Sequence, residues 1–227
     1  MSSHPLTCWT VIRGAADGDP RDRDDFARRY EPVVRAYFGA RWRSSRRLQA
    51  LDDVVQDVFL ECFRQGGALD RVEPDRPGGF RAFLYGVARV VALRAESARG
   101  RGKEEAPPEG FDPGQVAADE TRLSLAFDRA WARGLLAEAA VRQAEDAGRA
   151  GDAAVWRVEL LRLRFHDGLP VREIARLRGR EPDAVHRDYA RARQEFRAAL
   201  GAVVAFHHPG TPAEVERECA GLLALLE

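Results

Sequence analysis

Apolar residues recur at spacings of three and four along almost the whole chain, which is the period of an amphipathic α-helix. Residues 24–42, 51–63 and 80–95 each have such a stripe, and alternation typical of strands is nearly absent. The first stripe consists of Phe26, Tyr30, Val33, Val34, Tyr37, Phe38 and Trp42. The pattern therefore predicts an all-α protein with a real hydrophobic core.

The segment 51–63 has two clearly different faces. Its apolar face consists of Leu51, Val54, Val55, Val58, Phe59, Cys62 and Phe63, and its polar face of Asp52, Asp53, Gln56, Asp57 and Glu61. Gly66 and Gly67 follow and should end the helix. An exposed acidic face is expected, which by itself is typical of any solvated helix.

Residues 97–120 have a different composition, rich in glycine and proline and poor in residues that could join a core. We interpret them as a flexible linker between two helical domains, 1–96 and 121–206. A C-terminal amphipathic helix is expected over 207–227, where Thr211 and Glu214 have the spacing of a capping box and Pro212 fits the first helical position.

The most specific local pattern lies between residues 171 and 193. Ala175, Gly179 and Val185 have the spacing of a helix-turn-helix: a small residue at the helix contact, a glycine in the turn and a branched residue in the second helix. Ile174 and Leu177 should complete the buried side of the first helix. An ordinary helical hairpin is the alternative.

The second helix of this pair should present a row of side chains to a DNA major groove. The outward positions are Asp183, His186, Arg187, Ala190 and Arg191. Arg178 and Arg180 flank the turn glycine, where apolar residues are usual. We therefore expect them to extend along the surface, or the turn to be less buried than is normal.

The formal net charge is zero, but the charges are segregated. Lys103 is the only lysine, and residues 155–200 contain eleven arginines against seven acidic residues. Residues 79–95 contain three arginines and no acid. Because arginine binds phosphates and guanine edges with a forked geometry, nucleic acid remains a candidate partner.

Several functional classes find no support in the sequence. There is no catalytic Ser-His-Asp or Cys-His set, no phosphate-binding glycine loop and no cysteine pair at metal-ligand spacing, so we expect no enzyme activity, cofactor or small-molecule substrate. We find neither an apolar run of membrane length nor a signal pattern, and therefore expect a cytoplasmic protein without membrane insertion.

Three strings in order resemble bacterial sigma factors of the extracytoplasmic-function class. They are LDDVVQDVF at 51–59, GFRAFLYGVAR at 79–89, and the region 160–200 with LLRLRF, REIA and RAR. The string YEPVVR at 30–35 also resembles this family. The resemblance covers roughly residues 24–96 and 121–200, and it implies two helical domains that bind core RNA polymerase and promoter DNA.

The resemblance also implies residue roles. The residues expected to bind core polymerase are Asp53, Gln56, Asp57 and Leu60. Those expected to contact a single-stranded −10 element are Arg81, Phe83, Tyr85, Arg89 and Arg94. Those expected to contact the duplex −35 element are Asp183, His186, Arg187 and Arg191. An anti-sigma protein is a further partner known for this family.

A different function uses only the second of these DNA contacts. An autonomous helix-turn-helix regulator needs no polymerase surface, and it usually dimerises to reach two half-sites. The face formed by Asp53, Gln56 and Asp57 distinguishes the two hypotheses, because only a sigma factor requires it.

Overall fold

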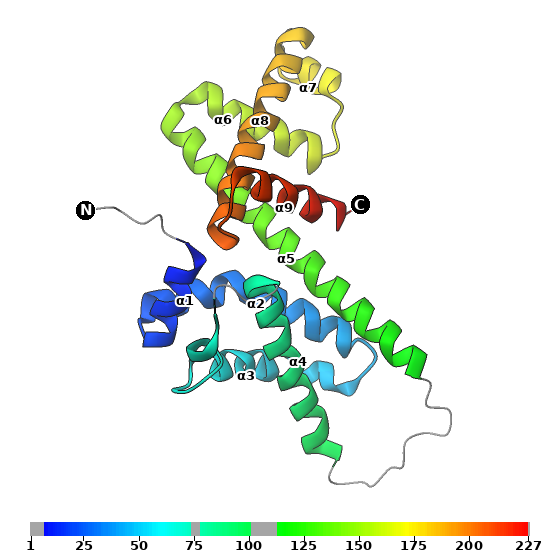
Figure 1. Cartoon of the computed structure of the whole chain (residues 1–227). Helices are drawn as coiled ribbons and strands as arrows, with labels where there is room; N and C mark the ends of the chain where they lie inside the picture. Colours follow the sequence, from blue (N-terminus) through cyan, green and yellow to red (C-terminus); the bar gives the residue numbers. More distant parts are fainter. Residues whose placement is uncertain (1–6, 74–77, 101–112, 227) are drawn as a thin grey trace, which may run out of the picture. The chain divides into compact units, whose positions relative to one another are not determined.

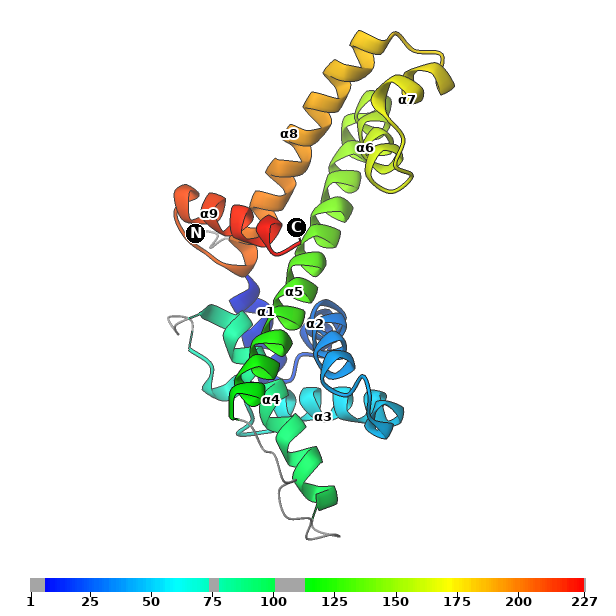
Figure 2. The same ribbon diagram turned by 90° about the vertical axis from the view of Figure 1, so that its right-hand side faces the viewer.

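The computed structural model describes residues 7–73, 78–100 and 113–226, and helices are the only regular elements of these residues (Figure 1, Figure 2). The α-helices are α1 Cys8–Asp17, α2 Pro20–Arg41, α3 Leu51–Phe63, α4 Gly79–Gly100, α5 Pro113–Ala150, α6 Asp152–Phe165, α7 Val171–Leu177, α8 Pro182–His207 and α9 Pro212–Ala224. Two short 3₁₀ helices cover Arg46–Ala50 and Leu69–Arg71. The all-α prediction is confirmed.

The chain forms two compact units. The first contains residues 1–134, 206–209 and 220–227, and the second contains 135–205 and 210–219. These units differ from the expected boundaries of 1–96, 97–120, 121–206 and 207–227. The reason is α5, whose first half joins the first unit by burying Leu123, Phe127 and Trp131. Helix also occupies both ends of the expected linker, because α4 continues to Gly100 and α5 begins at Pro113.

An aromatic cluster around Phe26 forms the centre of the first unit. The Phe26 side chain is fully buried, and its ring centroid lies 4.7–6.1 Å from four aromatic rings of α2, α3 and α4. These rings belong to Tyr30, Phe59, Phe63 and Phe80. Tyr30 also stacks on Trp131 of α5 at 5.5 Å, which ties α5 to the same core.

Near the C-terminal ends of α2 and α4, a charged pair joins the two helices: Glu96 of α4 and Arg41 of α2. The Glu96 carboxylate accepts two hydrogen bonds from the Arg41 guanidinium, at 2.8 and 2.9 Å, and one from the Trp42 indole at 2.9 Å. Burial acts to raise the pKa of Glu96, but the hydrogen bonds from Arg41 and Trp42 outweigh it, and the pKa is lowered. Glu96 is therefore held as a carboxylate.

The second unit has its own apolar cluster, built from α6, α7 and α8. Its buried members are Leu160, Leu163, Val171, Ile174, Ala175 and Val185. Beyond this cluster, the guanidinium of Arg157 makes a forked contact with the Glu195 carboxylate, with hydrogen bonds of 2.7–3.0 Å. Only 8% of Arg157 is exposed, so this pair joins α6 to α8 through a buried guanidinium and a partly exposed carboxylate.

The sequence pattern did not predict α1, but it did predict the start of α9. The apolar stripe predicts a first helix from residue 24, whereas α1 precedes it and α2 begins at Pro20. The Asp19 carboxylate caps α2 by accepting hydrogen bonds from the amides of residues 21 and 22. At α9 the predicted capping box is present, because Thr211 and Glu214 exchange side-chain and backbone hydrogen bonds of 2.7–3.4 Å.

We predict that Glu96→Gln lowers the free energy of unfolding by about 1–3 kcal/mol at neutral pH, because it removes one charge of a largely buried pair. Since the pKa of Glu96 is lowered in the folded state, its stabilisation is present above the unfolded pKa of about 4.3. That stabilisation disappears as the pH falls through the folded pKa. Urea unfolding should therefore show the variant's deficit shrinking in acid.

The matched control is Glu73→Gln, which removes the charge of an exposed carboxylate outside the helices. Its effect should stay within about 0.5 kcal/mol. Equal effects of the two substitutions, or a Glu96→Gln deficit that is independent of pH, would contradict the stabilising role of the Arg41–Glu96 pair.

Candidate nucleic-acid interface

Helix α3 turns one face to the core and the other to solvent. Val54, Val55 and Val58 are at most 3% exposed. The four residues expected to bind polymerase, Asp53, Gln56, Asp57 and Leu60, are all exposed. Leu60 stands out because 65% of its surface is accessible although it is apolar. Asp53 and Asp57 have no ion-pair partner among the described residues, so their charges are available to a partner.

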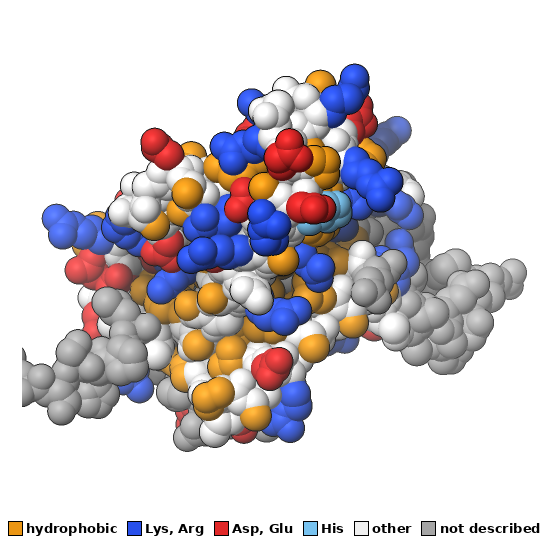
Figure 3. Space-filling view, turned by 90° about the horizontal axis from the view of Figure 1, so that it is seen from above, with side chains coloured by type: hydrophobic (Ala, Val, Ile, Leu, Met, Phe, Trp, Pro, Cys, Tyr) orange, Lys and Arg blue, Asp and Glu red, His pale blue; other side chains and the backbone are white. Residues whose placement is uncertain are grey.

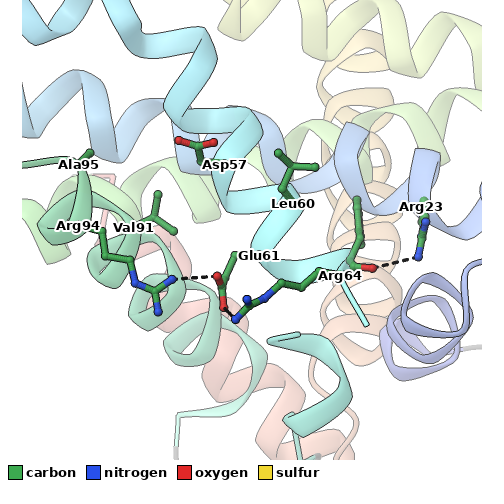
Figure 4. Close-up of a pocket in the computed structure, with 9 residues that line it drawn as sticks. Arg23, Asp57, Leu60, Glu61, Arg64, Val91, Arg94 and Ala95 are labelled. Carbon is green, nitrogen blue, oxygen red and sulfur yellow. Dashed lines mark hydrogen bonds and ion pairs between the residues drawn. The ribbon is translucent and has the colours of Figure 1, made fainter. Parts of the chain in front are cut away.

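A hollow of about 650 Å³ lies between α3 and α4, beside this face (Figure 4). Asp57 and Leu60 contribute to its lining together with Val91 and Ala95 of α4. Figure 4 shows Glu61 between two arginines, and its carboxylate is 2.9 Å from Arg94 and 2.8 Å from Arg64. The polar face of α3 thus continues into a groove with apolar and charged walls.

Helix α4 places the five residues expected to contact a −10 element in two different environments. Phe83 faces the core with 8% of its surface exposed, so in this structure its ring is not accessible to a base. Arg81, Tyr85, Arg89 and Arg94 reach the surface at least in part. The sequence alone could not show that Phe83 belongs to the core, because an aromatic residue next to a buried stripe can either pack in the core or contact a base.

The four accessible residues of α4 all contact carboxylates. Arg81 lies 3.6 Å from Asp128, and Arg94 pairs with Glu61. Tyr85 and Arg89 both donate to the Glu120 carboxylate, at 3.2 and 3.1 Å. Burial and the neighbouring Glu120 carboxylate raise the pKa of Tyr85 to about 12, so its hydroxyl remains a hydrogen-bond donor at neutral pH.

Helices α7 and α8 are joined by a short turn that contains Gly179. Ala175 and Val185 are buried at the contact between the helices, and Gly179 has a φ of +59°. Ile174 is fully buried as expected, but Leu177 is 58% exposed, because it lies at the last position of α7, where the chain turns outward. The expectation that Leu177 is buried was therefore wrong.

The arginines beside Gly179 lie along the surface. The Arg180 guanidinium lies 4.2 Å from the centre of the Trp156 ring, whose indole donates to Asp188 at 2.8 Å. Arg178 pairs with Glu159 at 3.0 Å. Cation–π contact and ion pairing thus replace the apolar side chains usual at this turn. Residues 177–181 are all exposed, so both expected alternatives apply: the arginines extend along the surface, and the turn is less buried than usual.

The outward row of α8 is accessible. Asp183, His186, Arg187, Ala190 and Arg191 are all exposed along its first turns. On the face shown in Figure 3, arginine and acidic side chains are interspersed with apolar ones. This mixture agrees with the zero net charge, so any contact with DNA must depend on short local rows of arginine and not on a general basic surface.

Other site classes find no support in the described ranges. No group of three or more His, Cys, Asp or Glu side chains in them could hold a metal ion. Within the same ranges, no helix combines the length and the apolar character that a membrane crossing requires.

We predict that Gly179→Ala lowers the stability of the second unit by about 1 kcal/mol, because alanine is strained at positive φ. A new Cβ would meet no atom within 4 Å, so the cost comes from the backbone alone. Gly201→Ala is the matched control, since it also adds a Cβ in open space but lies inside α8. It should raise stability by about 0.5–1 kcal/mol. Thermal unfolding measures both, and the same sign for the two variants would contradict this account of the turn.

Comparison with known proteins gives one informative match. No protein-family model matches the chain. The ECF RNA polymerase sigma factor ShbA of Streptomyces griseus is 28% identical to it over 193 residues, which cover 83% of this chain and 92% of that protein. A match of this length is longer than the first unit alone, so it extends into both units. This similarity relates the chain to the ECF RNA polymerase sigma factors.

Proposed function

We propose that this chain is a promoter-specificity subunit that binds core RNA polymerase through α3 and promoter DNA through α4 and α8. The observation that carries the proposal is the exposed row of α3, where Leu60 is 65% accessible and shares the solvent-facing side of the helix with Asp53 and Asp57. An autonomous regulator has no need for such a row, whereas a polymerase subunit does.

The chemistry of this row suits a partner with basic and apolar side chains. Burying a leucine side chain that was exposed contributes about 1.5–3 kcal/mol. Carboxylates that have no intramolecular ion pair lose no existing contact when they meet an arginine or lysine of a partner. The hollow beside Asp57 and Leu60 offers additional apolar surface from Val91 and Ala95.

The two DNA contacts would differ in kind. Helix α4 combines Arg81, Arg89 and Arg94 with exposed apolar side chains at Val90 and Leu93, which suits a strand whose bases are unstacked. Helix α8 presents a row of polar side chains near its start, which is how a recognition helix reads duplex DNA in the major groove.

Within the α8 row, Arg187 and Arg191 are the strongest candidates for direct contact. They are four residues apart and both exposed, and Arg191 lies 3.6 Å from Glu195, at the limit of an ion pair. A bidentate contact with a guanine contributes about 1–3 kcal/mol of discrimination. His186 and Asp183 lie on the same exposed side and would adjust the sequence preference.

We predict that Asp53→Arg combined with Asp57→Arg weakens assembly with core RNA polymerase by at least about 10–100-fold, because the new charges repel a basic partner surface. Fluorescence anisotropy of the labelled chain, titrated with purified core enzyme, measures this. Folding should be unaffected, since both positions are exposed on α3.

The matched control is Asp24→Arg combined with Asp70→Arg. These residues are also exposed in the first unit, and their replacement changes the net charge by the same amount. The control should assemble like the native chain. Equal loss in both double variants would show a general charge effect, and no loss in either would remove α3 as the polymerase-binding face.

A further inference from the structure

The Glu120 carboxylate lies where side chains from two other helices of the first unit converge. One of its oxygens accepts hydrogen bonds from the Tyr85 hydroxyl at 3.2 Å and from the Arg89 guanidinium at 3.1 Å. The other oxygen lies 3.6 Å from a guanidinium nitrogen of Arg41. Two cations and one neutral donor thus surround a single anionic group.

Arg41 and Tyr85 have contacts other than Glu120 that hold them in position, whereas the contact of Arg89 is with Glu120 itself. Arg41 is fixed by its forked contact with Glu96 and by a hydrogen bond of 3.2 Å to the Tyr37 hydroxyl. The Tyr85 ring lies edge-on against Phe127 and Tyr37, with centroids 5.4 and 5.5 Å apart. Removal of the Glu120 charge would therefore leave two donors held in place, Arg41 and Tyr85, and a third cation, Arg89, without its anion.

A phosphate oxygen satisfies the same donors as a carboxylate oxygen. Arginine binds both groups through similar charge-assisted hydrogen bonds, and a tyrosine hydroxyl donates to either. Glu120 is 31% exposed, so a dissolved anion can reach its position. The carboxylate thus marks the place where an external phosphate would be bound.

The surroundings favour the phosphate of a single nucleic-acid strand. Val90 and Leu93 of α4 are 43% and 40% exposed, and they line a shallow hollow of about 290 Å³ together with Arg94 and Ser97. Exposed apolar side chains beside arginines provide a surface for unstacked bases, which a duplex keeps in its interior.

We infer that Arg41, Tyr85 and Arg89 form a binding site for a backbone phosphate of single-stranded DNA, and that Glu120 occupies this site in the free chain. The inference rests on the proposed function, to which it adds Arg41 as a contact and Glu120 as an internal competitor. Binding of the strand exchanges one anion for another, so the native chain binds more weakly than its arginines would allow.

The test uses Glu120→Gln in the full chain, which keeps the shape of the side chain and removes its charge. Fluorescence anisotropy with a labelled single-stranded oligonucleotide should show affinity increased by about 3–10-fold. Glu145→Gln is the matched control, since it changes an exposed glutamate of the same helix α5 and should leave the affinity unchanged.

Two double variants show whether the gain in affinity for single-stranded DNA depends on Arg89. Arg89→Gln should abolish the gain of Glu120→Gln, whereas Arg28→Gln, at an exposed arginine thirteen residues before Arg41 in α2, should preserve it. Native-like circular dichroism is required of every variant. Unchanged affinity of Glu120→Gln, an equal gain with Glu145→Gln, or a gain that persists without Arg89 would overturn the inference.

Failure of this inference is distinguishable from failure of the proposed function. Assembly with core polymerase is measured separately, and it depends on α3 and not on Glu120. A chain that assembles with core polymerase while Glu120→Gln has no effect would overturn only the inference. A chain that gains affinity through Glu120→Gln but never binds the core enzyme would overturn only the proposed function.

Discussion

Burial of Phe26 among four aromatic rings is the constraint on which the first unit depends. Because these rings come from α2, α3 and α4, they fix which side of each helix faces inward. The polar side of α3 must then face solvent, and so must the arginines of α4. Truncation of a fully buried phenylalanine to alanine typically costs 3–5 kcal/mol, so the functional surfaces depend on this packing.

The zero net charge of this protein limits how strongly it attracts DNA from a distance. With equal numbers of acidic and basic residues, it lacks the general positive field by which many proteins attract DNA. The arginines of α4 are instead paired with nearby carboxylates, namely Glu61, Glu120 and Asp128. Each pairing lowers affinity for non-specific polyanions, since an incoming phosphate must compete with a carboxylate that is already in place.

Much of the fold could be predicted from the sequence, because helix periodicity is a local property. The apolar stripes of 24–42, 51–63 and 80–95 identified their buried residues, and the capping box at Thr211 identified the start of α9. Helix α1 and the early start of α5 were missed. Helix α1 does have an apolar stripe, at Cys8, Val11, Ile12 and Ala15, but it is only ten residues long, whereas the start of α5 lies in a stretch rich in glycine and proline. Packing against the aromatic core, for example of Trp131 on Tyr30, anchors α5.

The positions of the candidate site residues could be predicted from the sequence only in part. The exposed row of α3 follows from periodicity alone, whereas the burial of Phe83 and the exposure of Leu177 depend on how helices pack and end. The position of Glu120 beside Arg41 joins residues 79 positions apart in the chain. Only the tertiary structure brings these two residues together.

Reconstituted transcription would show whether this chain directs RNA polymerase to promoters. Purified core RNA polymerase would be incubated with genomic DNA fragments, with and without the full chain, and the transcript starts would be mapped. A promoter-specificity subunit would give discrete start sites that require the chain, with two protected DNA segments upstream of each. A chain that fails to bind core polymerase and instead protects DNA by itself would be an autonomous DNA-binding protein and not a polymerase subunit.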